Sequence, residues 1–146
     1  MLALACMSAP ENALLVREAL TAFRQGRLSD LTRLISEDVT WHSPGSNALS
    51  GTYRGHAGLL EYLKKVSQVG LPFEVNDLTA SDKHVIALMR DTFRRPDGQV
   101  YEHMGCLVCR VADGRVAEVW AINNEQATYD ALLAEHIAMR PDGVRR

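Results

Sequence analysis

Between residues 73 and 123 the chain is a run of long segments in which apolar and polar residues alternate, separated by very short turns. Alternation with a period of two predicts β-strands, and such short turns join strands that are antiparallel neighbours. We expect strands at residues 73–78, 84–95, 99–112 and 116–122. A chain with this run must fold around a sheet of long antiparallel strands.

The first half of the chain has helical spacing instead. Ser8-Ala-Pro-Glu11 matches a capping box and predicts a helix over 9–25. A short helix ending near 35, a strand over 39–43, a loop over 44–52 and a helix over 56–70 follow, and Asn123 or Asn124 can cap a last helix. Helices separated in this way from strands predict an α+β fold with helices on one face of a curved sheet.

Size and charge limit the classes of protein. The 146 residues carry 16 basic and 18 acidic side chains, which is typical of one globular domain, expected over 9–138 with tails at 1–8 and 139–146. The absence of a long Lys/Arg cluster argues against a nucleic-acid partner. The absence of a long apolar run argues against a membrane segment or signal peptide, so we expect a cytoplasmic protein.

The cysteines do not indicate a metal or redox site. Cys106 and Cys109 lie three residues apart on a predicted strand, so they point to opposite faces and cannot share a disulfide or a metal ion. Cys6 is far away in sequence, and no His, Asp or Glu pair has the spacing of a metal site. We therefore expect neither a metal nor another cofactor.

Four motifs resemble the SnoaL-like branch of the nuclear-transport-factor-like (ketosteroid-isomerase-like) superfamily: GRLSDL from Gly26, EDVTWHSPG from Glu37, GTYRG from Gly51 and CRVADGRVAEVW from Cys109. The resemblance implies a cone-shaped α+β half-barrel. Its strongly curved mixed or antiparallel sheet would wrap around the N-terminal helices and a central pocket, in a homodimer that pairs sheet faces. The superfamily includes cyclases, isomerases, epoxide hydrolases and proteins that only bind, so fold does not decide function.

The residues that carry chemistry in relatives are mostly replaced here. Ser43 stands at the general-base position of the steroid isomerases, and Leu107 at one of their oxyanion positions, which argues against that reaction. Asp91 matches one aspartate of the epoxide hydrolases of this fold. Met89 stands in place of their arginine, and Ala121 in place of their second aspartate.

Hairpin geometry nominates one acid/base pair. If Pro96-Asp97-Gly98 is a three-residue turn, Asp91 lies opposite His103 and Met89 opposite Gly105, on an otherwise apolar face. A carboxylate beside an imidazole can orient the ring and raise its basicity. A two-residue turn would instead pair Thr92 with His103 and send Asp91 to the other face. A structural His–Asp hydrogen bond is the alternative role for the pair.

Five other residues are predicted to contact the substrate. Alternation puts Trp41 and Ser43 on one face of their strand and His42 on the other, and the resemblance turns the first face toward the pocket. The remaining predicted contacts are Met89, a pocket-rim donor at Tyr53 and a hydrogen bond from Asn123.

Two functions follow from this pattern. One is an enzyme without a cofactor that uses His103, oriented by Asp91, to move a proton during cyclisation, isomerisation or epoxide opening of an apolar cyclic natural product. The other is a non-catalytic protein that binds a small ligand or uses its sheet for assembly, motivated by Ser43 and Ala121. An open cavity that exposes both dyad groups favours the enzyme, and a filled interior favours the binding protein.

Overall fold

The computed structural model describes residues 7–140 and contains one six-stranded sheet in the order β2-β1-β6-β5-β4-β3. The pairing of β1 with β6 is parallel and all other pairings are antiparallel. The elements are α1 (Ala9–Arg24), α2 (Leu28–Leu34), β1 (Ile35–Ser43), β2 (Gly51–Arg54), α3 (Gly55–Val69), β3 (Phe73–Ala80), β4 (His84–Arg94), β5 (Val100–Ala112), β6 (Arg115–Asn123) and α4 (Gln126–Ala138).

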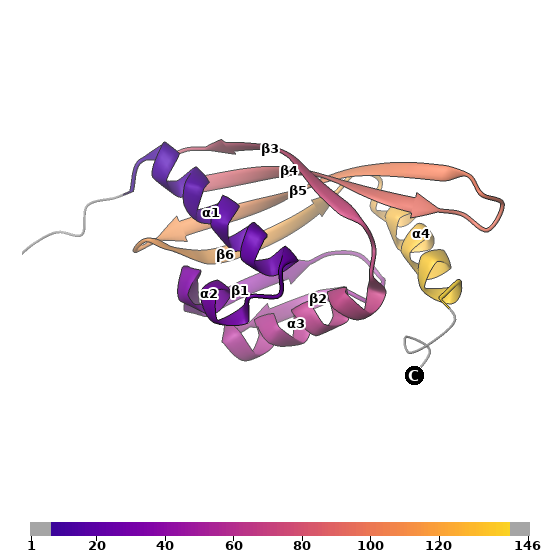
Figure 1. Ribbon diagram of the computed structural model, residues 1–146, viewed down its shortest axis with the longest axis horizontal. Helices are drawn as coiled ribbons and strands as arrows, with labels where there is room; N and C mark the ends of the chain where they lie inside the picture. Colours follow the sequence, from indigo (N-terminus) through magenta and orange to yellow (C-terminus); the bar gives the residue numbers. More distant parts are fainter. Residues whose placement is uncertain (1–6, 141–146) are drawn as a thin grey trace, which may run out of the picture.

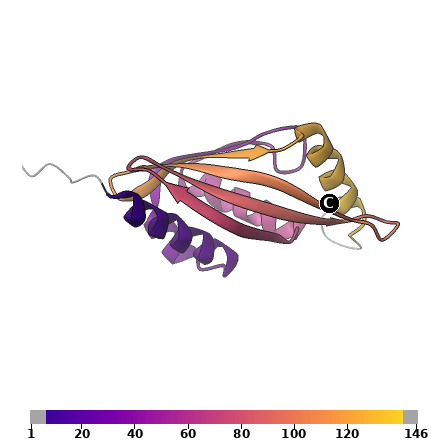
Figure 2. The same cartoon turned by 90° about the horizontal axis from the view of Figure 1, so that it is seen from above.

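The sheet is strongly bent and its concave face is covered by helices (Figure 1). Helices α1, α2 and α3 lie against one half of this face, and α4 lies at the other end, beside the protruding β4–β5 hairpin (Figure 2). An ion pair of 3.1 Å between Arg95 Nε and Glu135 Oε1 joins that hairpin to α4. The predicted α+β half-barrel with a curved, unclosed mixed sheet is therefore confirmed.

Helix α1 forms where the capping box predicts it. The Ser8 hydroxyl accepts the Glu11 N–H at 3.3 Å, and the Glu11 carboxylate accepts the Ser8 N–H at 3.2 Å. Such a cap contributes about 1 kcal/mol to the stability of a helix. Cys6 and most of both predicted tails, 1–8 and 139–146, lie outside the described residues.

The long hairpin has the register that the three-residue turn predicts. Arg95 N–H donates to the Gln99 carbonyl at 2.8 Å, and Gly98 adopts a φ of +86°, which a glycine tolerates without strain. Asp91 consequently pairs with His103, and Met89 with Gly105. The alternative with a two-residue turn is wrong.

Two local predictions are wrong. Residues 51 and 52, predicted to end a loop, begin strand β2, because the backbone of residues 51–54 pairs with the edge of β1, with Tyr53 opposite Trp41. Helix α4 is not capped by an asparagine: its N-cap is Glu125, with a φ of +49° and no side-chain cap bond. The backbone carbonyl of Asn124 instead forms a hydrogen bond with His103.

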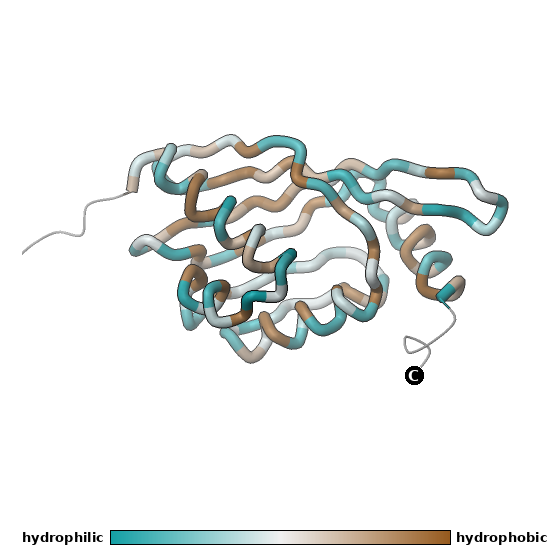
Figure 3. The backbone as a smooth tube through the Cα atoms, viewed as in Figure 1, coloured by the Kyte–Doolittle hydropathy of each residue, from teal (hydrophilic) through white to brown (hydrophobic). Residues whose placement is uncertain are grey.

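Hydrophobic and hydrophilic segments alternate along strands and helices (Figure 3), and the apolar ones meet between the helices and the concave face. Val39, Leu59, Val119 and Leu133 are at most 1% exposed and form the centre of this core. None of the helices that the structure describes is both long and apolar enough to cross a membrane.

Candidate functional site

A cavity of about 100 Å³ lies between the concave face of the sheet and helices α1, α3 and α4. Most of its wall is apolar and includes Leu20, Phe23, Val66, Phe73, Met89 and Leu107. Six residues with polar atoms interrupt this wall: Trp41, Ser43, Tyr62, Asp91, Asn123 and Tyr129. Polar groups that converge in an apolar pocket are typical of a small-molecule site.

Strand β1 divides its side chains between the two sheet faces as alternation predicts. Trp41 and Ser43 line the cavity. His42 lies on the other face, where its ring stacks on Trp120 with centroids 5.5 Å apart and its Nε2 is 2.7 Å from Glu118 Oε2. His42 therefore has no part in the cavity.

Asp91 and His103 are adjacent, but only Asp91 lines the cavity. His103 Nδ1 is 3.3 Å from Asp91 Oδ2, and Nε2 is 2.8 Å from the Asn124 carbonyl oxygen. The His103 side chain is buried behind the carboxylate, and its ring lies 4.7 Å from that of Tyr129. Proximity of the pair is confirmed, whereas the expectation that both groups face the cavity is wrong.

The hydrogen bonds of His103 determine where its protons lie. A backbone carbonyl can only accept, so Nε2 must carry a proton and donate it to Asn124. Nδ1 then either carries a second proton and donates to the Asp91 carboxylate, or accepts the proton of a neutral Asp91. In both states one proton is shared between His103 Nδ1 and the Asp91 carboxylate. Because the carboxylate lines the cavity, this proton can be exchanged with a ligand there.

The surroundings of His103 favour its charged form. Burial lowers the pKa of the imidazole, but the hydrogen bonds to Asp91 and Asn124 and the charge of Asp91 outweigh burial and raise this pKa above its ordinary value. The shift therefore favours the imidazolium form of His103.

Two tyrosines, Tyr62 and Tyr129, complete the cavity and were missed in the sequence. Burial raises the pKa of Tyr62 to about 12. Burial, and to a smaller extent the charge of Asp91, also raises the pKa of Tyr129. Both phenols stay protonated at neutral pH and can donate hydrogen bonds. Tyr62 lies between Leu59 and Val66 on the apolar stripe of α3, and nothing in that pattern separates a cavity phenol from a core one.

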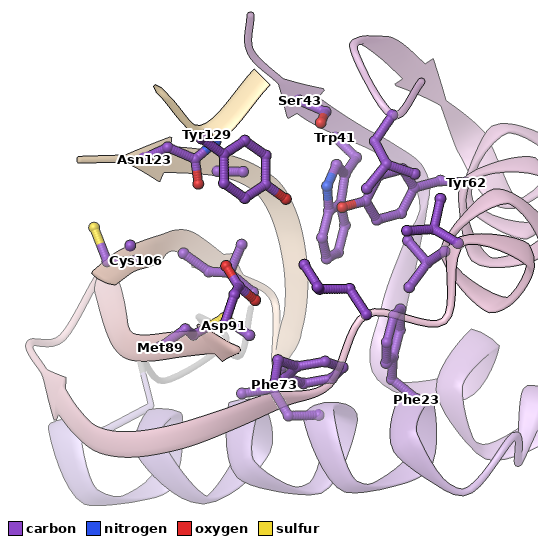
Figure 4. Close-up of a pocket in the computed structure, with 18 residues that line it drawn as sticks. Phe23, Trp41, Ser43, Tyr62, Phe73, Met89, Asp91, Cys106, Asn123 and Tyr129 are labelled. Atoms are coloured by element: carbon purple, nitrogen blue, oxygen red, sulfur yellow. The ribbon is translucent and has the colours of Figure 1, made fainter. Parts of the chain in front are cut away.

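Trp41 Nε1 is a buried donor with no partner in full hydrogen-bond geometry within residues 7–140, although it interacts with the neighbouring Tyr62 hydroxyl and opposes the rise in the pKa of that phenol. Trp41 is 6% exposed, and its ring lies 4.9 Å from that of Tyr62. In Figure 4 Trp41 and Tyr62 lie on one side of the cavity, Asp91 lies on the other, and the Tyr129 hydroxyl points between them. An unpaired buried donor costs about 1–3 kcal/mol, which a ligand acceptor can recover.

Tyr53 is not a pocket-rim donor, and that prediction is wrong. Its hydroxyl donates to the Leu49 carbonyl at 2.9 Å and accepts from Lys65 Nζ at 3.2 Å. Both hydrogen bonds are made within the fold, so this hydroxyl is not available to a ligand. The pairing of β2 with β1 carries Tyr53 behind Tyr62, whose ring it meets edge-on at 5.0 Å. Tyr53 thus supports a cavity residue without being one.

Met89 and Asn123 line the cavity as predicted. Asn123 Nδ2 donates to Gln126 Oε1 at 3.2 Å, which ties the end of β6 to α4. No group of three or more His, Cys, Asp or Glu side chains in residues 7–140 is arranged to hold a metal ion. Cys106 and Cys109 are free thiols, and burial raises the pKa of Cys109 to about 12.

Comparisons with known proteins agree with this architecture. The SnoaL-like domain family matches residues 16–119. Uncharacterized proteins of Mycobacterium tuberculosis and Mycobacterium bovis are 30% identical over 109 residues, which are 72% of this chain and 82% of theirs.

Two solved structures are also similar. An NTF2-like protein from Burkholderia xenovorans LB400 has a TM-score of 0.74 at 25% identity, covering 88% of this chain and 96% of its own. Bal32a, from a soil-derived mobile gene cassette, has a TM-score of 0.75 at 26% identity, covering 86% of this chain and 98% of its own.

Proposed function

The chain belongs to the SnoaL-like family, and we propose that it is an enzyme that moves a proton on an apolar, cyclic small molecule without a cofactor. The observation that carries this proposal is the Asp91 carboxylate, which faces an apolar cavity and is backed by the buried imidazole of His103. A carboxylate that shares a proton with a neighbour can accept or deliver one at a reacting carbon or oxygen.

The roles within the dyad differ from those expected from the sequence. Asp91 is the group that exchanges a proton with the substrate, because it alone of the pair lines the cavity. His103 is a positioning residue that holds the carboxylate and supplies or receives its shared proton. The Asn124 carbonyl keeps the ring in the required protonation state.

The opposite side of the cavity suits a substrate oxygen. Trp41 Nε1–H has no acceptor in full hydrogen-bond geometry in the described chain, and the Tyr62 phenol with which it interacts stays protonated. Donors held in place before the reaction stabilise negative charge that develops on a carbonyl or epoxide oxygen, by about 3–4 kcal/mol for one donor. Ser43 lies beside Trp41 and Asn123 lies across the cavity beside Tyr129 (Figure 4), and both remain candidate substrate contacts.

Proton exchange on a simple cyclic ketone tests the proposal without knowledge of the natural substrate. We expect the protein to accelerate α-deuteration of 2-tetralone in D₂O, followed by NMR, and Asp91→Asn to lower the rate about 10²–10⁴-fold. Asp82→Asn, at an exposed turn, is the matched control and should exchange at the wild-type rate. Equal rates for wild type and Asp91→Asn would contradict the proposal.

A second function, ligand binding without catalysis, is favoured by the burial of His103, which leaves Asp91 as the one member of the pair that lines the cavity. In the same experiment a binding protein would shift the 2-tetralone resonances without deuterating the ketone.

We also propose that the chain forms a homodimer through the convex face of the sheet. Two apolar rows cross this face: Ile86, Val108 and Trp120 form one, and Leu88, Cys106 and Ile122 form the other. Ile86, Leu88 and Ile122 are 37–50% exposed, an arrangement typical of an interaction surface.

Sedimentation analysis tests the dimer. Ile122→Lys places a charge at the β6 end of the second apolar row, and we expect a monomer where the wild type is a dimer. Leu14→Lys, at an exposed leucine of α1, should leave the dimer intact. A monomeric wild-type protein would overturn this assignment.

A further inference from the structure

A larger groove lies on the surface next to the cavity. It has a volume of about 750 Å³ and runs between the end of α1, the start of α2, α3 and the Leu71-Pro72 linker. Leu28 and Leu60 line it and are 47% and 40% exposed, which makes the groove floor apolar. The groove is thus several times larger than the cavity behind it.

The groove and the cavity are adjacent. Phe23, Val66, Leu71 and Phe73 line both of them, so these side chains form the boundary between the two spaces. Phe23 and Phe73 meet edge-to-face with centroids 6.0 Å apart (their sticks lie together in Figure 4). A molecule that reaches Asp91 through this boundary leaves the rest of its length in the groove.

The groove carries positive charge that the protein does not neutralise. Arg24 and Lys64 line it, both are exposed, and none of the described lining residues is acidic. Within residues 7–140 neither cation forms an ion pair. The Arg24 guanidinium lies 5.4 Å from the centre of the Phe73 ring, a contact that leaves its N–H donors free.

We propose that this groove binds the carboxylate-bearing tail of an elongated substrate whose cyclic end enters the cavity. The planar guanidinium of Arg24 matches a carboxylate with two parallel hydrogen bonds, and Lys64 adds a second positive charge. With the tail in the groove, the cavity has to hold only the reacting end of the substrate, which accounts for its small volume. The inference deepens the proposed function, because it places the reacting end at Asp91.

Two matched probes test the groove by binding alone. We expect 6-phenylhexanoate to bind about three- to tenfold more tightly than 6-phenylhexan-1-ol, which has the same apolar body and no charge. The indole N–H resonance of Trp41 reports occupation of the cavity, and that of Trp120, on the convex face, is the internal control.

Substitutions then separate charge from packing. Arg24→Ala and Lys64→Ala should each weaken the acid about two- to fivefold and leave the affinity for the alcohol unchanged. Arg17→Ala, on the exposed face of the same helix, is the control and should bind both probes like the wild type. Arg24→Lys keeps the charge and should recover most of the affinity for the acid.

The groove inference and the proposed function can fail separately. Equal affinity for acid and alcohol, unchanged affinity in Arg24→Ala and Lys64→Ala, or no shift of the Trp41 resonance would overturn the groove inference. These results would leave the effect of Asp91→Asn on ketone deuteration as it stands. Loss of acid binding in the groove variants, together with normal deuteration by Asp91→Asn, would support the groove and contradict the catalytic proposal.

Discussion

Each face of the sheet carries one histidine paired with one carboxylate, and the two pairs differ in ways that distance does not reveal. The convex pair, His42 and Glu118, is the shorter at 2.7 Å, against 3.3 Å for His103 and Asp91. The convex side chains are 34% and 25% exposed, whereas those of the concave pair are 1% and 17% exposed. In a single protomer water competes for the first pair and is excluded from most of the second.

The comparison teaches that burial and a partner at each ring nitrogen, rather than a short bond, make a pair useful for chemistry. Solvent-exposed ion pairs contribute about 0.2–1 kcal/mol because water and salt screen them. His103 is fixed at both ring nitrogens, and its carboxylate partner faces an apolar cavity. Of the two pairs, only the concave one has a proton held at a known position between two side chains and a carboxylate that a ligand can reach.

Removal of each histidine should produce the largest difference between the faces. His103→Ala leaves the Asn124 carbonyl and one side of Asp91 without a partner, so we expect the free energy of unfolding to fall by about 2–4 kcal/mol. His42→Ala should cost about 1 kcal/mol or less. Urea denaturation of both variants measures this, and equal losses would show that burial does not separate the pairs.

The two pairs should respond to pH in opposite directions. The folded pKa of His103 is raised, so its contribution to stability is complete below the unfolded value of about 6.5 and is lost as pH rises through the folded pKa. The pKa of Glu118 is lowered, chiefly by the hydrogen bond to His42. Its contribution is complete above the unfolded value of about 4.3 and is lost as pH falls through the folded pKa.

Stability measured against pH tests these signs. The loss caused by His103→Gln should be larger at pH 6 than at pH 8.5, and the loss caused by Glu118→Gln should shrink below pH 4. The NMR titration of the His103 ring should have its midpoint above about 6.5. A midpoint below that value would mean that burial outweighs the two hydrogen bonds.

Of these tests, a change in salt concentration should change the stability contributions of the two pairs least. At 1 M ionic strength the screening length is about 3 Å, so the exposed His42–Glu118 pair loses most of its small contribution. The concave pair is shielded from ions by the core, and we expect the stability loss of His103→Ala to be the same at 0.1 M and 1 M NaCl. A marked salt dependence of that loss would contradict the burial argument.

The sequence made the main elements and one register predictable because these depend on local rules. The capping box at Ser8 begins α1, and the Pro96-Asp97-Gly98 turn sets Asp91 opposite His103. Alternation along β1 separated Trp41 from His42, and the family resemblance predicted correctly that the Trp41 face meets the cavity.

The errors concern depth and long-range partners. The Tyr53 hydroxyl bonds to the Leu49 carbonyl and Lys65 because Tyr53 lies on strand β2. The glycine- and serine-rich sequence around β2 is typical of a loop, so the strand was not predicted. Tyr62 and Tyr129 reach the cavity only because α3 and α4 dock at particular angles. No periodicity in a single helix contains that information.

By itself the sequence determined the α+β architecture, the SnoaL-like family and the pairing of Asp91 with His103, because periodicity, turn length and motif order are local properties of the chain. Only the tertiary structure decided which member of the pair meets a ligand. The Asn124 carbonyl, 21 residues away from His103, holds the imidazole behind the carboxylate. That contact arises when β6 and α4 close the end of the sheet, and it makes Asp91 the group that faces the cavity.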